Sequence, residues 1–293
     1  MILYFCQAQD TKHCFEKRIN MEQSKMTGQI SPIKLSLDST FTFECRKDLS
    51  CFTSCCRDIN IILTPYDIIR MKNRLNLSSD EFLAIYTIPQ LLDKTDLPVI
   101  TLKMLEDEEN ACPFVREDGC LIYSDRPVTC RYYPLGSGTL AHKDDADDQQ
   151  GFFFFINESH CKGFEETCNW TVRDWRNDQD ASSFDEINSG WYDLMVMKRS
   201  FPPTLHLTEK AKHLFFIASY NIDKFKRFIF ESDFIKLYDV DKNTAEEMRE
   251  DEIKLFKFGQ EWLKWVLFKK GDFSVNAEIA AQRQNKSTQT DPQ

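Results

Sequence analysis

Eight cysteines in two groups are the residues of this chain whose type and spacing could do chemistry. The first group lies within twelve residues and ends in a vicinal pair: Cys45, Cys51, Cys55 and Cys56. The second group follows downstream: Cys112, Cys120, Cys130 and Cys161. A single buried cysteine behaves as a small hydrophobic side chain, but eight clustered thiols exceed what packing needs. The two groups therefore predict a thiolate site for a metal ion or cluster.

The spacing of the first group limits how its thiols can bind. Cys51-x3-Cys55 lets one turn present two ligands to one metal. Cys55 and Cys56 are adjacent, and adjacent side chains of an extended chain point to opposite faces. Both can therefore ligate only in a turn or across two metals. Eight ligands allow two mononuclear zinc sites, one cluster with spare thiols, or a multinuclear site, and spacing alone leaves these alternatives open.

Three features favour an iron–sulfur cluster over zinc. The candidate donors are nearly all sulfur, with His160 as the only nitrogen that could replace a thiol. Their number exceeds what one structural zinc needs. A shell that excludes water tunes the reduction potential of a cluster, and aromatic residues crowd the motif: Phe52, Phe114, Tyr123, Tyr132 and Tyr133. All-sulfur zinc sites are common, so zinc stays the alternative.

A thiolate site also needs positive partners. Four thiolates around zinc, or around a cubane cluster, leave a charge of about −2, and a buried anion requires nearby cations or donors. Arg57, Arg126 and Arg131 each lie beside a cysteine or within a few residues of one. We expect these arginines to support the bound group, with ordinary surface arginines as the alternative. Three cysteines stay outside the predicted ligand set: Cys6, Cys14 and Cys168.

Composition narrows the class of protein. Apolar residues make up 42% of the 293 residues, which is enough for a sizeable core. A net charge of −10 and a pI near 5.1 argue against a nucleic-acid binder. The chain has no apolar run of about 18 residues, the length that a membrane span needs. The start of the chain also lacks the features of a secretory signal. We therefore expect a cytoplasmic protein, where structural disulfides are rare and clustered cysteines favour metal.

Short elements must position the thiols. Strands are predicted at 41–43 and 59–63, on either side of the first cysteine group. Thr64-Pro65-Tyr66-Asp67 predicts a helix start with a capping box, and Ser78 with Glu81 predicts a second one. That second helix is expected to end at Pro89.

Around the second group, strands are predicted at 98–105 and 151–156. Between them, Asp125 is expected to cap a helix that carries Pro127 in its first turn and ends near Pro134.

Helical periodicity takes over from about residue 171, where the cysteines stop. Thr208 and Asp223 are expected to begin two helices, and Thr244 with Glu247 a long one that stops at Gly271. The sequence thus predicts an α+β fold, with a cysteine-cluster domain at 41–170 and a helical region at 171–275.

Both ends of the chain are expected to lie outside this fold. Residues 1–40 are predicted to be a disordered or mis-annotated extension, because Met21 and Met26 could each be the start. Residues 276–293 are predicted to be a disordered tail.

The motifs of residues 41–165 resemble the YkgJ-type cysteine-cluster family. The resemblance is carried by the Cys55-Cys56 cluster, the helix start at 63–68, Gly119-Cys120-Leu-Ile-Tyr123-x-x-Arg126-Pro127-x-x-Cys130-Arg131-x-Tyr133-Pro134, and Cys161-x-Gly163. The family cluster is usually written with tighter spacing than the five residues between Cys45 and Cys51. The resemblance implies a bacterial zinc- or iron-chelating domain, and the helical region is similar to the tail of longer bacterial members.

Two other function classes stay open, and no catalytic residue is predicted. The flagellin lysine N-methylase shares the cysteine cluster, which makes a protein-modifying methyl transfer the enzymatic alternative. Against it, the chain has only nine Gly and no Gly-rich loop to hold S-adenosylmethionine. The Cys-x3-Cys-x2-Cys spacing of radical enzymes would also need a third cysteine where Asp58 stands. The second class is a structural zinc domain that serves the helical region as an interaction module.

Overall fold

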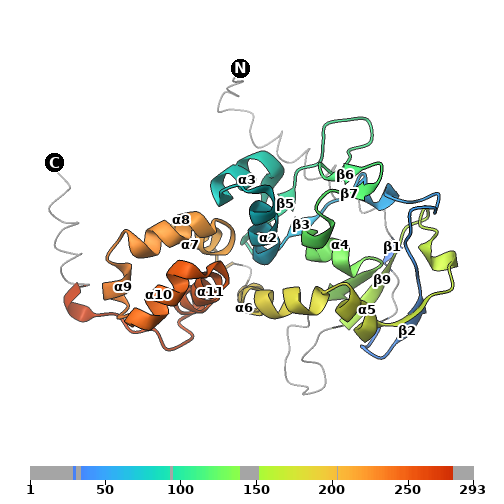
Figure 1. Ribbon diagram of the computed structural model, residues 1–293. Coiled ribbons are helices and arrows are strands. Elements are labelled where there is room, and N and C mark those ends of the chain that lie inside the picture. The colour runs from blue at the N-terminus through green and yellow to red at the C-terminus, as the bar shows by residue number, and fades with distance from the viewer. Residues whose placement is uncertain (1–28, 31–33, 93–94, 139–151, 203, 280–293) are drawn as a thin grey trace.

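The computed structural model describes residues 29–30, 34–92, 95–138, 152–202 and 204–279. Small sheets and short helices build the part that carries the cysteines, and the chain after residue 172 is helical. The predicted α+β fold is therefore confirmed. In Figure 1, α4, α5 and strands β1, β2 and β9 lie on the right, α7 to α11 lie on the left, and α2, α3 and α6 lie between them.

The strands of the described residues pair into four small antiparallel sheets. The first sheet has the order β1-β9-β8 (Gln29–Ile30, Phe152–Asn157, Leu135–Gly138), and the second pairs β10 with β2 (Asn169–Thr171, Thr40–Thr42). The third has the order β3-β5-β4 (Ile62–Leu63, Pro98–Leu102, Thr87–Leu91), and the fourth pairs β6 with β7 (Val115–Arg116, Gly119–Cys120). Each sheet either joins segments that are distant in the sequence or closes a hairpin. These short strands therefore hold the loops that carry the cysteines in place.

Two of the three predicted capping boxes are present; at the third, Asp241 rather than Thr244 caps the helix. Thr64 caps α2 (Pro65–Leu75), where its hydroxyl accepts from the Asp67 N–H and the Asp67 carboxylate accepts from the Thr64 N–H. Ser78 and Glu81 do the same for α3 (Ser79–Tyr86). The chain leaves α3 directly into β4, which contains Pro89, so the helix ends three residues before the proline.

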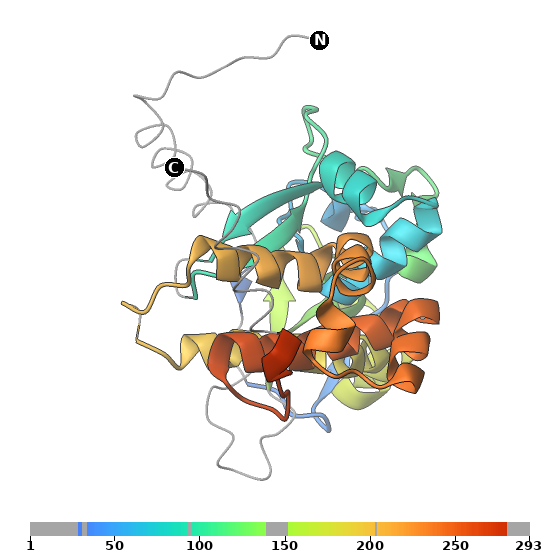
Figure 2. The ribbon, with the colours of Figure 1, turned by 90° about the vertical axis from the view of Figure 1, so that its left-hand side faces the viewer.

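The remaining helices run from the cysteine region to the end of the described chain. They are η1 (Ser54–Cys56), η2 (Tyr123–Asp125), α4 (Val128–Tyr132), η4 (Gly163–Glu165), α5 (Val172–Asp178), α6 (Ala181–Arg199), α7 (Glu209–Tyr220), α8 (Ile222–Phe230), α9 (Phe234–Leu237), α10 (Lys242–Glu250) and α11 (Glu252–Phe268). Thr208 caps α7 as predicted. Figure 2 shows α7 to α11 from their own side.

Four predicted helix boundaries are wrong. Asp125 belongs to η2, and α4 begins after Pro127. Asn221 rather than Asp223 caps α8. The long helix expected from Thr244 is two helices, because Asp251 leaves the helical conformation and its carboxylate caps α11 anew. Helix α11 also ends at Phe268, before Gly271.

Part of the expected N-terminal extension takes part in the fold. Strand β1 pairs with β9, Leu35 forms a bridge with Phe153, and the Leu35 side chain is buried. The fold therefore begins before residue 41, because β9 needs a partner along its free edge. Cys6 and Cys14 lie outside the described residues, as do residues 280–293 of the expected tail. Residues 276–279 of that tail are described, and the Asn276 N–H donates to the Leu237 carbonyl (2.8 Å).

Two hydrophobic cores stabilise the described chain. The larger joins α2, α3 and β5 to helices α6 to α11, with Phe82, Ile100 and Trp262 among its fully buried members. The smaller lies under β2, α4, β9 and α5 and includes Phe43 and Trp175. The larger core crosses the boundary expected near residue 171, so the helices pack directly against the cysteine part.

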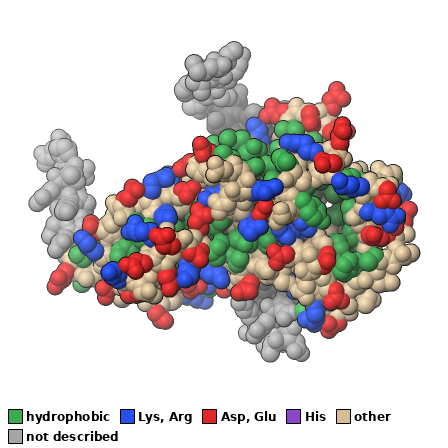
Figure 3. All heavy atoms as spheres, in the orientation of Figure 1, with side chains coloured by type: hydrophobic (Ala, Val, Ile, Leu, Met, Phe, Trp, Pro, Cys, Tyr) green, Lys and Arg blue, Asp and Glu red, His purple; other side chains and the backbone are tan. Residues whose placement is uncertain are grey.

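The exterior is mixed in charge. On the face shown in Figure 3, acidic and basic side chains are interspersed rather than gathered by sign. No helix among the described residues has the length and apolar character that crossing a membrane requires.

Candidate metal centre

A run of turns folds the first cysteine group back on itself. Backbone hydrogen bonds close turns at 46–49, 49–52 and 51–54, and η1 completes the segment. Thr53 adopts a left-handed conformation (φ 66°) that reverses the chain just before the vicinal pair. The long gap between Cys45 and Cys51 is taken up by these turns, so both thiols face the same cavity.

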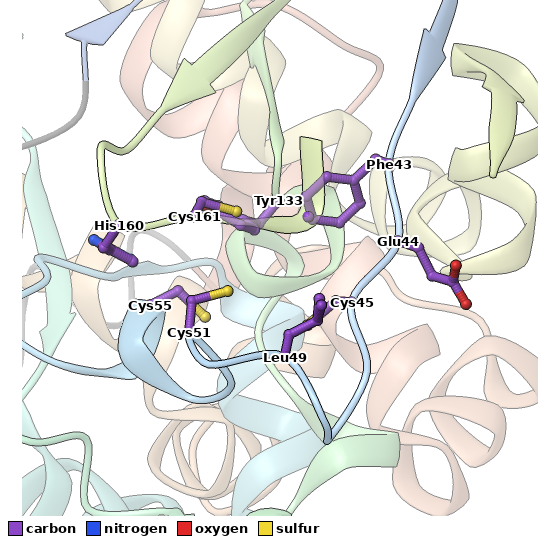
Figure 4. A pocket seen from close by; sticks show the side chains of 10 residues that line it. Phe43, Glu44, Cys45, Leu49, Cys51, Cys55, Tyr133, His160 and Cys161 are labelled. Atoms are coloured by element: carbon purple, nitrogen blue, oxygen red, sulfur yellow. The ribbon is translucent and has the colours of Figure 1, made fainter. Parts of the chain in front are cut away.

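That cavity is small and lined by four of the predicted ligands. Cys45, Cys51, Cys55 and Cys161 line it, and we call them the outer set. Figure 4 shows their side chains around the cavity, together with Tyr133 and His160. The cavity volume is about 20 Å³, which is room for roughly one water-sized particle. As the side chains stand, there is space for a single ion but not for a cluster.

Contacts between segments that are more than a hundred residues apart in the sequence hold the outer set together. The Glu44 N–H donates to the Gly163 carbonyl (3.1 Å), and the Lys162 N–H donates to the Cys51 sulfur (3.2 Å). The hydroxyl oxygen of Tyr133 is buried and has no hydrogen-bond partner within the described chain, and it lies close to the Cys161 thiol. Such an orphaned donor beside a thiol fits a site that holds a thiolate or its metal complex.

Gly163 is required for this approach. A Cβ at Gly163 would lie 2.5 Å from a Phe43 ring carbon and 2.8 Å from the Glu44 carbonyl oxygen. From the sequence, Gly163 was recognised only as part of the Cys161-x-Gly163 motif. The fixed spacing from Cys161 was the one signal that a glycine is needed where this loop approaches Glu44.

Replacing Gly163 with alanine is expected to separate the Cys161 loop from the strand that leads to Cys45. We expect the free energy of unfolding to fall by about 2 kcal/mol and metal bound by the outer set to be lost in part. Denaturant unfolding and metal analysis measure both effects. Lys162→Ala is the matched control, because it changes an exposed neighbouring side chain and keeps the backbone donor to Cys51. Equal stability of the two variants would contradict this role for Gly163.

The other four cysteines lie beneath the outer set. We call Cys56, Cys112, Cys120 and Cys130 the inner set, because Cys112 is buried and all four contact the larger core. The Cys112 N–H donates to the Cys56 carbonyl (2.8 Å), and an isolated bridge joins Arg57 to Ala111. These contacts bring the two cysteine groups of the sequence together.

A hairpin and a short helix supply the last two thiols of the inner set. The β6–β7 pairing places Cys120 opposite Val115, three residues beyond Cys112. Cys130 lies in α4, and the Val128 N–H at the start of α4 donates to the buried Asp67 carboxylate (2.8 Å). Burial raises the pKa of Asp67 to about 6, although the hydrogen bonds that its carboxylate accepts from Thr64 and Val128 lower this pKa in part. Asp67 therefore ties α4 to α2 and fixes where Cys130 lies.

Burial and the neighbouring thiols shift the pKa values of several cysteines. Burial, and then the neighbouring thiols of the inner set, raise the pKa of Cys130 well above its usual value. Burial raises the pKa of Cys112 to about 11. In the vicinal pair, the Cys55 thiol donates a hydrogen bond to the Cys56 sulfur, which raises the pKa of Cys55 and lowers that of Cys56. Most of these thiols therefore carry protons at neutral pH.

The thiols converge without forming a finished coordination sphere. Within the described ranges, no three His, Cys, Asp or Glu side chains stand in an arrangement that could hold a metal ion. Cys168 lines neither set: its carbonyl accepts from the Phe43 N–H, and it does not border the cavity. His160 does border the cavity, where its Nε2 lies 3.2 Å from the Glu158 carboxylate.

The three arginines differ in where their charge lies. Arg57 donates to Glu109 (2.6 Å) and to the Thr53 carbonyl (2.8 Å), and its charge lowers the pKa of Cys56. Arg126 stacks on the Tyr123 ring at 3.9 Å and lowers the pKa of Cys120 in part, although burial raises that pKa overall. Both lie near the inner set.

Arg131 is held by backbone carbonyls and an aromatic ring. Its guanidinium donates to the carbonyls of Arg126 (3.1 Å), Gln179 (2.8 Å) and Ser124 (2.6 Å) and stacks on Phe184 at 4.2 Å. Arg131 therefore joins the loop before α4 to the end of α5. Consecutive helical residues point about 100° apart, and a role for Arg131 beside a bound group stays a prediction.

Fold and site together define an α+β protein with a domain of converging cysteines. Residues 44–169 match the family model named CxxCxxCC, described as a "putative zinc- or iron-chelating domain". This segment is thus similar to the domains of that family, and it is the segment in which the sequence motifs lie. The family name gives two residues between successive cysteines, whereas five and three occur here. No curated protein and no solved structure matches the chain.

Proposed function

We propose that the protein binds metal through its clustered cysteine thiolates and that the bound species is an iron–sulfur cluster. The observation that supports this most is the donor set. Six separate segments converge, and the side chains that line the outer cavity offer four sulfurs and one imidazole beside an aromatic shell. Sulfur donors in a largely apolar enclosure suit a cluster, whose potential depends on exclusion of water. Arg57 and Arg126 would offset the charge of the bound thiolates.

Zinc is the second candidate, and one observation favours it. The outer cavity has room for about one small particle as the side chains stand. A zinc ion needs only a rotation of four thiols toward a common point, whereas a cluster needs the cavity to widen. In this form the metal would be structural and would support the helical region through the shared larger core.

Purification without oxygen from iron-replete cells distinguishes these species. A brown protein with acid-labile sulfide, whose visible absorbance bleaches with dithionite, would support the cluster. A colourless protein with stoichiometric zinc and no labile sulfide would support the structural zinc domain instead. A folded protein that carries neither metal would overturn the proposed function.

Metal binding is expected to tighten steeply as the pH rises. The pKa values of Cys45, Cys112, Cys120 and Cys130 are raised, chiefly by burial, so these thiols are protonated near neutral pH. Each must lose its proton to bind metal. If four thiols bind one zinc, the apparent affinity should change by up to about four orders of magnitude per pH unit between about pH 6 and 8. Competition with a chelator, corrected for the chelator's own protonation, measures this slope. A flat profile would contradict protonated thiols in the metal-free state.

A further inference from the structure

We propose that the eight thiols form two separate four-thiol metal centres, divided between Cys55 and Cys56. The outer set would hold one centre and the inner set the other. This inference depends on the proposed metal-binding function and adds the number and composition of the centres, which the sequence left open.

The vicinal pair is the point of division. Cys55 lines the outer cavity, whereas Cys56 does not and packs against the larger hydrophobic core. Both residues lie in one turn of 3-10 helix, after the left-handed Thr53 and before the extended Arg57. Their thiols are hydrogen-bonded to each other, so the two sets meet at this turn. Cys55 borders the outer cavity there, and Cys56 contacts the larger core.

The two sets are also supported by different parts of the fold. Cys161 packs against the smaller core, and its loop is tied to the strand before Cys45 through Gly163. The inner set packs against the larger core, and a hydrogen bond from the Cys112 N–H to the Cys56 carbonyl ties two of its segments together. The centres could therefore form independently.

The chemistry of the donors fits this division. A structural zinc ion takes four thiolates, and a cubane cluster takes four as well. Two sets of four use every predicted ligand, whereas one shared centre would leave buried thiols unused beside a metal. So many thiols close together are more than packing of the core requires.

The number of metal ions per chain tests the inference with zinc as the probe. The full-length chain is produced in iron-limited, zinc-supplemented cells, purified without oxygen, and analysed for zinc and for its ligands by X-ray absorption. We expect about two zinc ions per chain, each with four sulfur ligands at about 2.3 Å. One zinc per chain, or zinc–zinc scattering from a bridged site, would overturn the inference and leave the proposed function standing. Folded protein without metal would overturn the proposed function itself.

Paired variants then assign the ions to the sets. Cys51→Ser with Cys161→Ser removes two ligands of the outer set, and Cys112→Ser with Cys120→Ser removes two of the inner set. Each is expected to retain about one zinc, and the control Cys168→Ser about two. If the inner variant does not fold, the outer variant decides, because its substitutions leave the four cysteines that contact the larger core unchanged. Loss of both ions from a folded outer variant would show one shared site.

Discussion

Cys130→Ser is expected to release metal from the inner set and to lower the free energy of unfolding by at least about 4 kcal/mol. Cys130 lies in α4 among three other thiols of the inner set, and burial raises its pKa well above the usual value. Without their cation, the deprotonated thiols of the inner set would repel one another or take up protons. Structural zinc contributes about 10–16 kcal/mol in small peptides, which is comparable to the stability of a whole domain.

Thermal unfolding and metal analysis of the same samples measure this effect. Cys168→Ser is the matched control, because Cys168 lies in the same domain but lines neither set of thiols, and it is expected to keep both stability and metal. Metal loss at unchanged stability would contradict the prediction. That result would indicate a preformed site whose purpose is binding rather than support of the fold.

Local chemistry made the starts of α2 and α3 predictable. Thr64 with Asp67 and Ser78 with Glu81 lie within four residues of each other, so each capping box is specified by adjacent side chains. The same logic failed at Asp251, because the periodicity of apolar residues continues across the break between α10 and α11. Two aspartates, Asp241 and Asp251, cap successive helices there, and only their spacing could have revealed two starts.

The candidate thiols could be selected by type and number, but the division that we propose for them could not. Cys55 and Cys56 are neighbours in the sequence, and which thiols each one meets depends on pairings with segments far along the chain. The hydrogen bond from Cys112 to Cys56 and the contact of Gly163 with Glu44 decide it. Such pairings leave no periodic signal in the residues themselves.

Arg131→Met is expected to lower the free energy of unfolding by about 4 kcal/mol without changing the metal content of the folded protein. The Arg131 guanidinium donates to three backbone carbonyls, and the residue is only 4% exposed. Methionine would fill much of the volume but leave these carbonyls without donors, and each unsatisfied buried group costs about 1–3 kcal/mol. Lysine should recover only part of the loss, because its single ammonium cannot match the planar fork of donors.

Denaturant unfolding with metal analysis measures this prediction, and Arg116→Met is the matched control. Arg116 is exposed and donates only to carbonyls in its own turn, so its replacement should change stability by less than about 0.5 kcal/mol. The sequence placed Arg131 beside the bound group because Cys130 precedes it, whereas its contacts join the loop before α4 to the end of α5. Folded Arg131→Met protein that loses metal at unchanged stability would restore the role that the sequence suggested. Equal losses of stability in the two arginine variants would show that the three carbonyls do not depend on Arg131.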